Sequence, residues 1–160
     1  RSVAQPMLAA RTPRDDGYPA VHHEAGDFAL LFDLLHDPRA QHLEPAGHDD
    51  HRRSLASGRR ESNPPGTRSI CDALLAPEPG VLTFEINRHR LAGGLAVSDA
   101  EVRAAIAYAA RTLKLVIEPG GAVALAAVLC GRFAARGRSV AIVLSGGNID
   151  DALLREVLAG

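Results

Sequence analysis

The chain has 160 residues, of which 46% are hydrophobic and 23% charged, and its formal net charge is −1. This length is enough for one domain with a buried core, and the near-neutral charge gives no basic patch for nucleic acid or an anionic membrane. Two cysteines outside any zinc-ligand spacing are too few for a disulfide-stabilised secreted module. The longest apolar run, Gly120 to Gly131, is shorter than the about 20 residues that cross a bilayer. The start of the chain does not resemble a signal peptide, so the sequence predicts a cytoplasmic protein.

The first quarter of the chain shows little regular pattern. Residues 1–26 have little hydrophobic periodicity and are interrupted by prolines, so we expect them to be irregular or disordered. A helix is predicted over 27–35, because Asp27 is a suitable N-cap, apolar residues share one face, and Pro38 follows. The segment His22-His23-Glu24 lacks the spacing of a metal-binding HExxH motif. We therefore interpret these residues as exposed loop side chains.

The middle of the chain changes from a polar segment to a clear helix signal. Residues 45–76 are largely polar and contain a turn signal at Asn63-Pro64-Pro65-Gly66, followed by a short predicted helix over 69–75. Further along, Ser98 and Glu101 have the spacing of a capping box. Apolar residues recur behind this box at helical spacing up to Leu113, so the sequence predicts an amphipathic helix there.

The remaining segments predict strands and a buried helix in alternation. A short apolar run at 115–117 is followed by residues 122–133, which are apolar on every side, as in a fully buried helix. Residues 139–144 form a β-branched run typical of a strand covered on both faces. After a glycine-rich turn, residues 149–158 predict a closing helix. This alternation predicts an α/β fold with a short parallel sheet and flanking helices.

The glycine-rich turn is Ser145-Gly146-Gly147-Asn148, directly after the predicted strand 139–144. Ligands of parallel α/β sheets bind beyond the carboxyl ends of the strands. Glycines allow the backbone to approach a ring closely, and the serine hydroxyl can donate and accept hydrogen bonds. An ordinary strand-to-helix turn explains the same four residues, and the pattern alone leaves both interpretations open.

Several segments, in order, resemble the C-terminal stretch of pyridoxal-phosphate-dependent threonine/serine dehydratases. These enzymes, also called threonine ammonia-lyases, share the tryptophan-synthase-β-like fold (fold type II) with serine racemase. The resemblance divides the chain into residues 1–42, which match nothing in the family, and residues 43–160, a C-terminal part of a dehydratase-like α/β domain. The matching segments are Leu43–Pro45, Arg53–Gly58, Ser69–Leu74, Ala96–Val102, Leu113–Ala124 and Val143–Asp150.

The resemblance implies two groups of site residues. Ser145 matches the serine that bonds the pyridine nitrogen of the cofactor, and Glu118 matches a glutamate beside the cofactor ring. Gly146, Gly147 and Asn148 match the turn under that ring.

A second group, Glu44, His48 and Asp50, matches positions that bind a divalent cation in several relatives. There the two acids give carboxylate oxygens and the middle residue its backbone carbonyl, ligands suited to Mg²⁺ or Ca²⁺. Solvated charges on a turn remain the alternative for these acids.

Two parts of the family pattern are absent from the sequence. The family needs a lysine that binds the cofactor covalently, in a Ser-x-Lys-x-Arg-Gly-like motif, and a glycine run that holds the cofactor phosphate. Lys114 is the only lysine and matches a position at the end of the capped helix. Where the glycine run is expected, the chain reads Ala25 to Leu30. The sequence therefore gives no catalytic residue.

These observations favour a C-terminal part of a threonine/serine ammonia-lyase that is inactive alone. The family eliminates the hydroxyl of a small hydroxy amino acid and releases a 2-oxo acid and ammonia. The implied partners are this substrate, pyridoxal phosphate, and either further copies of the chain or the missing N-terminal part, with no nucleic acid and no membrane. The alternative is a non-catalytic α/β interaction or assembly module derived from that family.

Overall fold

A computed structural model describes residues 41–160. The helix predicted over 27–35, the His22-His23-Glu24 segment and the expected disorder at the start of the chain lie outside these residues. The division of the chain after residue 42 stays a prediction.

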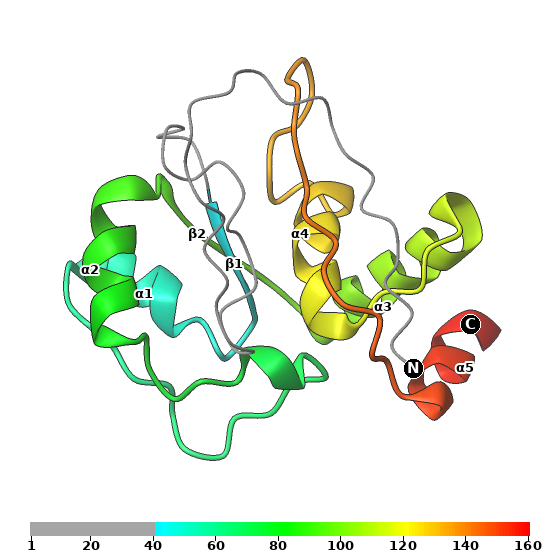
Figure 1. The fold of residues 1–160 in the computed structure, drawn as a ribbon, viewed down its shortest axis with the longest axis horizontal. Helices are drawn as coiled ribbons and strands as arrows, with labels where there is room; N and C mark the ends of the chain where they lie inside the picture. Colours follow the sequence, from blue (N-terminus) through cyan, green and yellow to red (C-terminus); the bar gives the residue numbers. More distant parts are fainter. Residues whose placement is uncertain (1–40) are drawn as a thin grey trace, which may run out of the picture.

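Two parallel strands form the sheet of the described region. Strand β1 (Gln41–Pro45) pairs with β2 (Gly93–Val97), from Gln41 opposite Gly93 to Pro45 opposite Val97. Parallel strands need a long crossover, and here it contains α1 (Asp50–Ser57), the single turn η1 (Asp72–Leu74) and α2 (Val81–Arg90). Helix α1 packs on one side of the sheet and α4 (Pro119–Leu129) on the other (Figure 1). The α/β class with a short parallel sheet and flanking helices is confirmed.

The strands of this sheet are not the ones that the sequence predicts. Residues 115–117 and 139–144 form neither a helix nor a strand, and they pair with no strand within 41–160. A strand needs a neighbour for its backbone hydrogen bonds, and close to these segments the backbone is joined by the Glu118 amide donating to the Gly146 carbonyl. Val140 and Val143 remain 38% and 37% exposed. The prediction of a two-sided strand at 139–144 is therefore wrong for the described part of the chain.

Two helices in the first half of the described region, α1 and α2, are not predicted by the sequence. Helix α1 lies inside the segment interpreted only as polar, and α2 and β2 follow it without a sequence prediction. The helix predicted over 69–75 shrinks to the turn η1. Helix α1 packs on both strands and α2 packs on α1, and local periodicity does not encode these tertiary contacts.

The capped helix forms as the sequence predicts. Helix α3 (Asp99–Tyr108) begins at Ser98, whose hydroxyl accepts from the Glu101 amide while the Glu101 carboxylate accepts from the Ser98 amide. It continues as the wider turn η2 (Ala109–Leu113), and Lys114 ends it with a left-handed φ of 60°.

The last two helices lie close to their predicted positions. Helix α4 starts at Pro119, where a missing amide hydrogen costs nothing, and it ends at Leu129, earlier than the predicted 122–133. Eight of its eleven residues are buried, which confirms the buried helix. Helix α5 (Asp151–Ala159) is capped by the Asp150 carboxylate, which accepts from the amides of Ala152 and Leu153.

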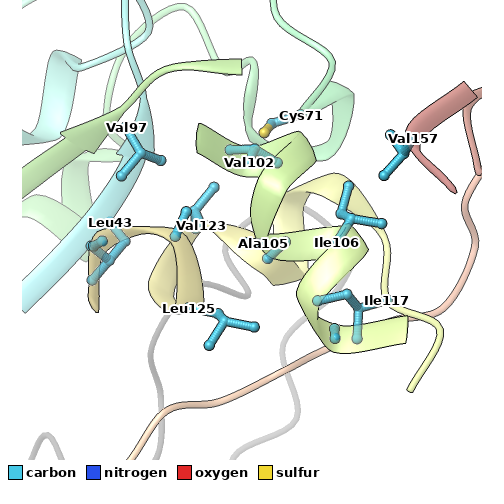
Figure 2. Packing of buried hydrophobic residues seen from close by; sticks show 14 residues of the cluster. Leu43, Cys71, Val97, Val102, Ala105, Ile106, Ile117, Val123, Leu125 and Val157 are labelled. Carbon is cyan, nitrogen blue, oxygen red and sulfur yellow. The ribbon is translucent and has the colours of Figure 1, made fainter. Parts of the chain in front are cut away.

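The core lies between α3 and α4 and extends to the sheet and to α5. Figure 2 shows Val102, Ala105 and Ile106 of α3 facing Val123 and Leu125 of α4. Leu43 and Val97 contribute from the sheet, and Cys71, Ile117 and Val157 from the flanking segments. No helix of the region 41–160 has the length and apolar character needed to cross a membrane.

Candidate functional site

Glu118 lies against the glycine-rich turn that separates residues 139–144 from α5. The Glu118 amide donates to the Gly146 carbonyl at 3.3 Å. Gly146 has a φ of +70°, and a Cβ atom built on it would overlap the carboxylate of Glu118. A Cβ on Gly147 would lie 3.3 Å from the carbonyl oxygen of Val116. Four of the residues implied for the cofactor ring, Glu118, Ser145, Gly146 and Gly147, therefore meet in space, and Asn148 follows in the same turn.

The N-terminus of α4 approaches the same turn. A Cβ atom on Gly121, in the first turn of α4, would overlap the carbonyl oxygen of Ser145. Only glycine permits this backbone contact. The arrangement fixes Ser145 next to the start of α4, so a neutral hydroxyl, a carboxylate and helix amides lie in one neighbourhood.

The only lysine of the chain has a structural partner. The Lys114 ammonium donates to the Arg111 carbonyl at 2.7 Å, and so satisfies a backbone acceptor at the end of its own helix. Ser145 and Glu118 thus lie together, as the resemblance implies for residues beside a cofactor ring, while the chain's one lysine is hydrogen-bonded to its own helix.

The second group of residues lies where β1 meets α1. Both oxygens of the Glu44 carboxylate accept backbone hydrogens of α1, from His51 at 3.0 Å and Arg52 at 2.9 Å. Asp50 accepts a hydrogen bond from the Asn63 amide group. Burial and the negative charge of Glu44 raise the pKa of Asp50, while the hydrogen bond from Asn63 opposes the rise. Two buried carboxylates with this mutual repulsion are suited to share a hard divalent cation.

The third member of that group, His48, has its side chain in contact with Thr67 and Asn63. The His48 Nε2 atom lies 2.9 Å from the Thr67 carbonyl, which can only accept, so Nε2 carries the hydrogen. The other ring nitrogen, Nδ1, lies 3.3 Å from the Asn63 amide nitrogen. The imidazole is thus engaged with Thr67 and Asn63, which is compatible with a cation ligand from the His48 backbone and not from its ring.

Two histidines that the sequence did not single out, His42 and His51, lie beside Glu44 in the corner where β1 meets α1. His42 Nε2 lies 3.5 Å and His51 Nδ1 3.8 Å from the same oxygen, Oε1 of Glu44. One donor atom from each of the three residues lies within 4.8 Å of the others. His42 and Glu44 are two apart in the chain, which is the spacing of one strand face, but His51 comes from a helix, so the sequence carried no signal for the triple.

Comparison with known proteins agrees with this geometry. A family model described as "Pyridoxal-phosphate dependent enzyme" matches residues 28–146. The chain belongs to this family of enzymes. It is 36% identical over 118 residues to a serine racemase of Dictyostelium discoideum, covering 72% of this chain and 36% of that protein. It is 37% identical over 105 residues to an L-threonine ammonia-lyase of Thermotoga maritima, covering 66% and 26%.

Solved structures give the same result. The crystal structure of a T.th. threonine deaminase superposes with a TM-score of 0.65 at 36% identity, over 70% of this chain and 37% of that one. The resemblance to the fold-type-II dehydratases and serine racemases is therefore confirmed. The chain spans about a third of the length of the relatives that it matches.

Proposed function

We propose that this chain is the C-terminal part of a pyridoxal-phosphate-dependent ammonia-lyase that acts on threonine or serine. The observation that carries the proposal is the contact between Glu118 and the turn Ser145–Asn148, closed by Gly121 and Gly146. Relatives named threonine ammonia-lyase support the substrate class. A small-molecule substrate fits a site built of one hydroxyl, one carboxylate and closely packed backbone. We also expect the protein to work in the cytoplasm.

Ser145 is proposed as the neutral hydrogen-bond partner of the cofactor ring. Pyridoxal phosphate, when bound, supplies the electron sink for the elimination. The Ser145 hydroxyl would donate to the ring nitrogen of the bound cofactor and, unlike a carboxylate, would not stabilise the protonated form of that nitrogen. Glu118 borders the same place, while Gly146, Gly147 and Asn148 shape the turn under the ring. We further propose a Mg²⁺ or Ca²⁺ ion at Glu44, Asp50 and the His48 backbone.

The 160-residue chain by itself is proposed to be inactive. Its single lysine, Lys114, bonds the end of its own helix, so proton removal from the substrate needs a group from another polypeptide segment. That segment would be a lysine-bearing remainder of the fold, because a further copy of this chain adds only another Lys114.

Purified chain mixed with pyridoxal phosphate and threonine tests this proposal. We expect no 2-oxobutanoate and, after borohydride reduction, no cofactor attached to Lys114 by mass spectrometry. The variant Lys114→Arg is the matched control and should behave as the parent chain does. A reducible adduct at Lys114 together with 2-oxobutanoate formation would overturn the proposal.

A non-catalytic assembly module is the second candidate, and exposed apolar residues favour it. Leu115, Val116, Val140 and Val143 are 37–43% exposed, on segments outside any helix or strand that a partner would have to cover. Adding a polypeptide with the lysine-bearing remainder of a threonine ammonia-lyase separates the two candidates. The ammonia-lyase predicts activity that falls in Ser145→Ala, whereas the module predicts a complex without activity.

A further inference from the structure

We propose that His42, Glu44 and His51 form a binding site for a transition-metal ion of the Zn²⁺ or Co²⁺ class. The site shares Glu44 with the expected group of oxygen ligands but adds two imidazoles in place of Asp50 and the His48 carbonyl. This ligand set would therefore bind Zn²⁺ or Co²⁺, whereas the oxygen ligands at the same place suit Mg²⁺ or Ca²⁺.

Backbone geometry brings the three side chains together. His42 and Glu44 lie on one face of β1, and α1 packs against this strand. The amides of His51 and Arg52 hold the Glu44 carboxylate in place, and each of its oxygens retains a second lone pair for a metal. Because Glu44 is 5% exposed and His51 6%, two of the three ligands are already buried.

Two of the three distances between ligand atoms come close to those around a bound ion, and the two imidazole nitrogens lie within 4.8 Å of each other. Tetrahedral zinc with bonds of 2.0–2.1 Å separates its ligand atoms by about 3.3 Å. His42 Nε2 and His51 Nδ1 lie 3.5 and 3.8 Å from Glu44 Oε1. The two imidazoles are stacked with centroids 4.2 Å apart and planes at 29°. Lone pairs lie in the ring planes, so the rings must tilt apart by side-chain rotation when a metal binds between them.

The charges around the corner also favour a cation. Arg52 and Arg53, the next residues of α1, pair through their side chains with Asp49. In the described region, the ring nitrogens of His42 and His51 lie 3.5 and 3.8 Å from the Glu44 carboxylate, and neutral imidazoles there can bind a metal. Asp50 Oδ2 lies 3.9 Å from His51 Nδ1 and adds negative charge at the edge. Two nitrogens and one oxygen suit zinc and cobalt, whereas Mg²⁺ and Ca²⁺ prefer oxygen ligands alone.

Cobalt titration of the metal-free full chain tests the site without cofactor or substrate. We expect one Co²⁺ per chain with the intense visible bands of four-coordination, displaced by Zn²⁺ and retained in excess Mg²⁺ or Ca²⁺. His42→Gln and His51→Gln should each weaken Co²⁺ binding by about tenfold or more. His89→Gln, on the exposed side of α2, and His22→Gln/His23→Gln should leave it unchanged.

Ring-nitrogen NMR of the parent chain keeps the test independent of variant folding. Zn²⁺ should shift the ring nitrogens of two of the seven histidines, and these should be His42 and His51. Co²⁺ binding that survives both substitutions, or a shift confined to other histidines, would overturn the proposal. So would loss of Co²⁺ binding in Asp50→Asn alone. None of these outcomes depends on whether the chain is part of an ammonia-lyase.

Discussion

Glycine at two positions decides how Glu118, Ser145 and α4 fit together. Gly146 takes a positive φ and faces the Glu118 carboxylate, and Gly121 faces the Ser145 carbonyl. An alanine methyl at either position would occupy space that is already filled. The turn is thus held by close backbone contact.

Gly121→Ala should destabilise the protein by about 1–3 kcal/mol, because its methyl overlaps the Ser145 carbonyl. Gly120→Ala is a matched control in the same helical turn, since its Cβ would meet Leu74 Cγ at 3.4 Å, an ordinary contact. We expect that control to be neutral or stabilising by about 0.5 kcal/mol, as alanine favours a helix over glycine. Urea unfolding of both variants measures the difference. Equal stability of the two would contradict the contact.

Sequence patterns found some site residues and missed others for a physical reason. Ser145 and Glu118 stand in motifs that resemble a known family, so their neighbourhood could be expected. His42 and His51 come together only because α1 packs on β1 and donates amides to Glu44. No spacing along the chain encodes such a contact between a strand and a helix.

Individual helices differ in how much of their structure is local. Helix α3 carries its own start signal, because Ser98 and Glu101 satisfy each other's backbone partners three residues apart. Helix α1 has no such signal from its own residues at the cap. The carboxylate that satisfies its first amides is Glu44, from the preceding strand. The start of α3 was therefore predictable from sequence, and the start of α1 was not.

The capping box also predicts a pH dependence. The backbone hydrogen bond from Ser98, with help from Arg132 and against a burial penalty, lowers the pKa of Glu101 from 4.5 to about 2. A carboxyl whose pKa is lower in the folded state than in the unfolded state stabilises the protein at pH values above the unfolded-state pKa. This contribution is lost as the pH falls toward 2. Unfolding measured between pH 7 and pH 2 should show it.

Glu101→Gln removes the charge but keeps a side chain that can fill the box. We expect a loss of about 0.5–1 kcal/mol at pH 7 that fades toward pH 2, where the parent carboxyl is also neutral. Glu156→Gln is the control, since Glu156 pairs with Arg103 from an exposed position on α5. A constant difference between Glu101→Gln and the parent at all pH values would contradict the assigned pKa.

The segment 139–144 shows that a local sequence pattern does not by itself predict a paired strand. Its β-branched run favours an extended backbone, but the segment forms no regular element. A strand is a paired structure, and no strand pairs with this segment in residues 41–160. Pattern indicates a preferred conformation, whereas pairing depends on what else is folded nearby.

For the molecule as a whole, the core gathers residues from nearly every element. Helices α3 and α4 provide most of it, and the sheet, η1 and α5 close its sides. Cys71 is fully buried in this core, while Cys130 is exposed beyond the end of α4. The two thiols therefore report separately on the core and on the surface.

Alkylation with iodoacetamide at pH 8 tests whether the chain holds this core by itself. Burial raises the pKa of the Cys71 thiol to about 12, with smaller effects from Asp99 and Asp72. We expect Cys130 to react promptly and Cys71 at least about a hundredfold more slowly, until urea unfolds the chain. Cys130→Ala leaves Cys71 as the sole target, and mass spectrometry counts the adducts. Equal rates for both thiols in the native protein would show that the core is open.

The sequence alone determined the family resemblance, the α/β class, the capped helix α3, the buried helix α4 and the closing helix α5. Each of these depends on residues near one another in the chain, where caps, periodicity and turns act locally. Only the tertiary structure decided that the sheet pairs residues 41–45 with 93–97, and that Gly121 of α4 meets the Ser145 carbonyl. It also decided that two histidines gather around Glu44. Such contacts join residues far apart in sequence, and the packing of whole elements, rather than local propensity, selects them.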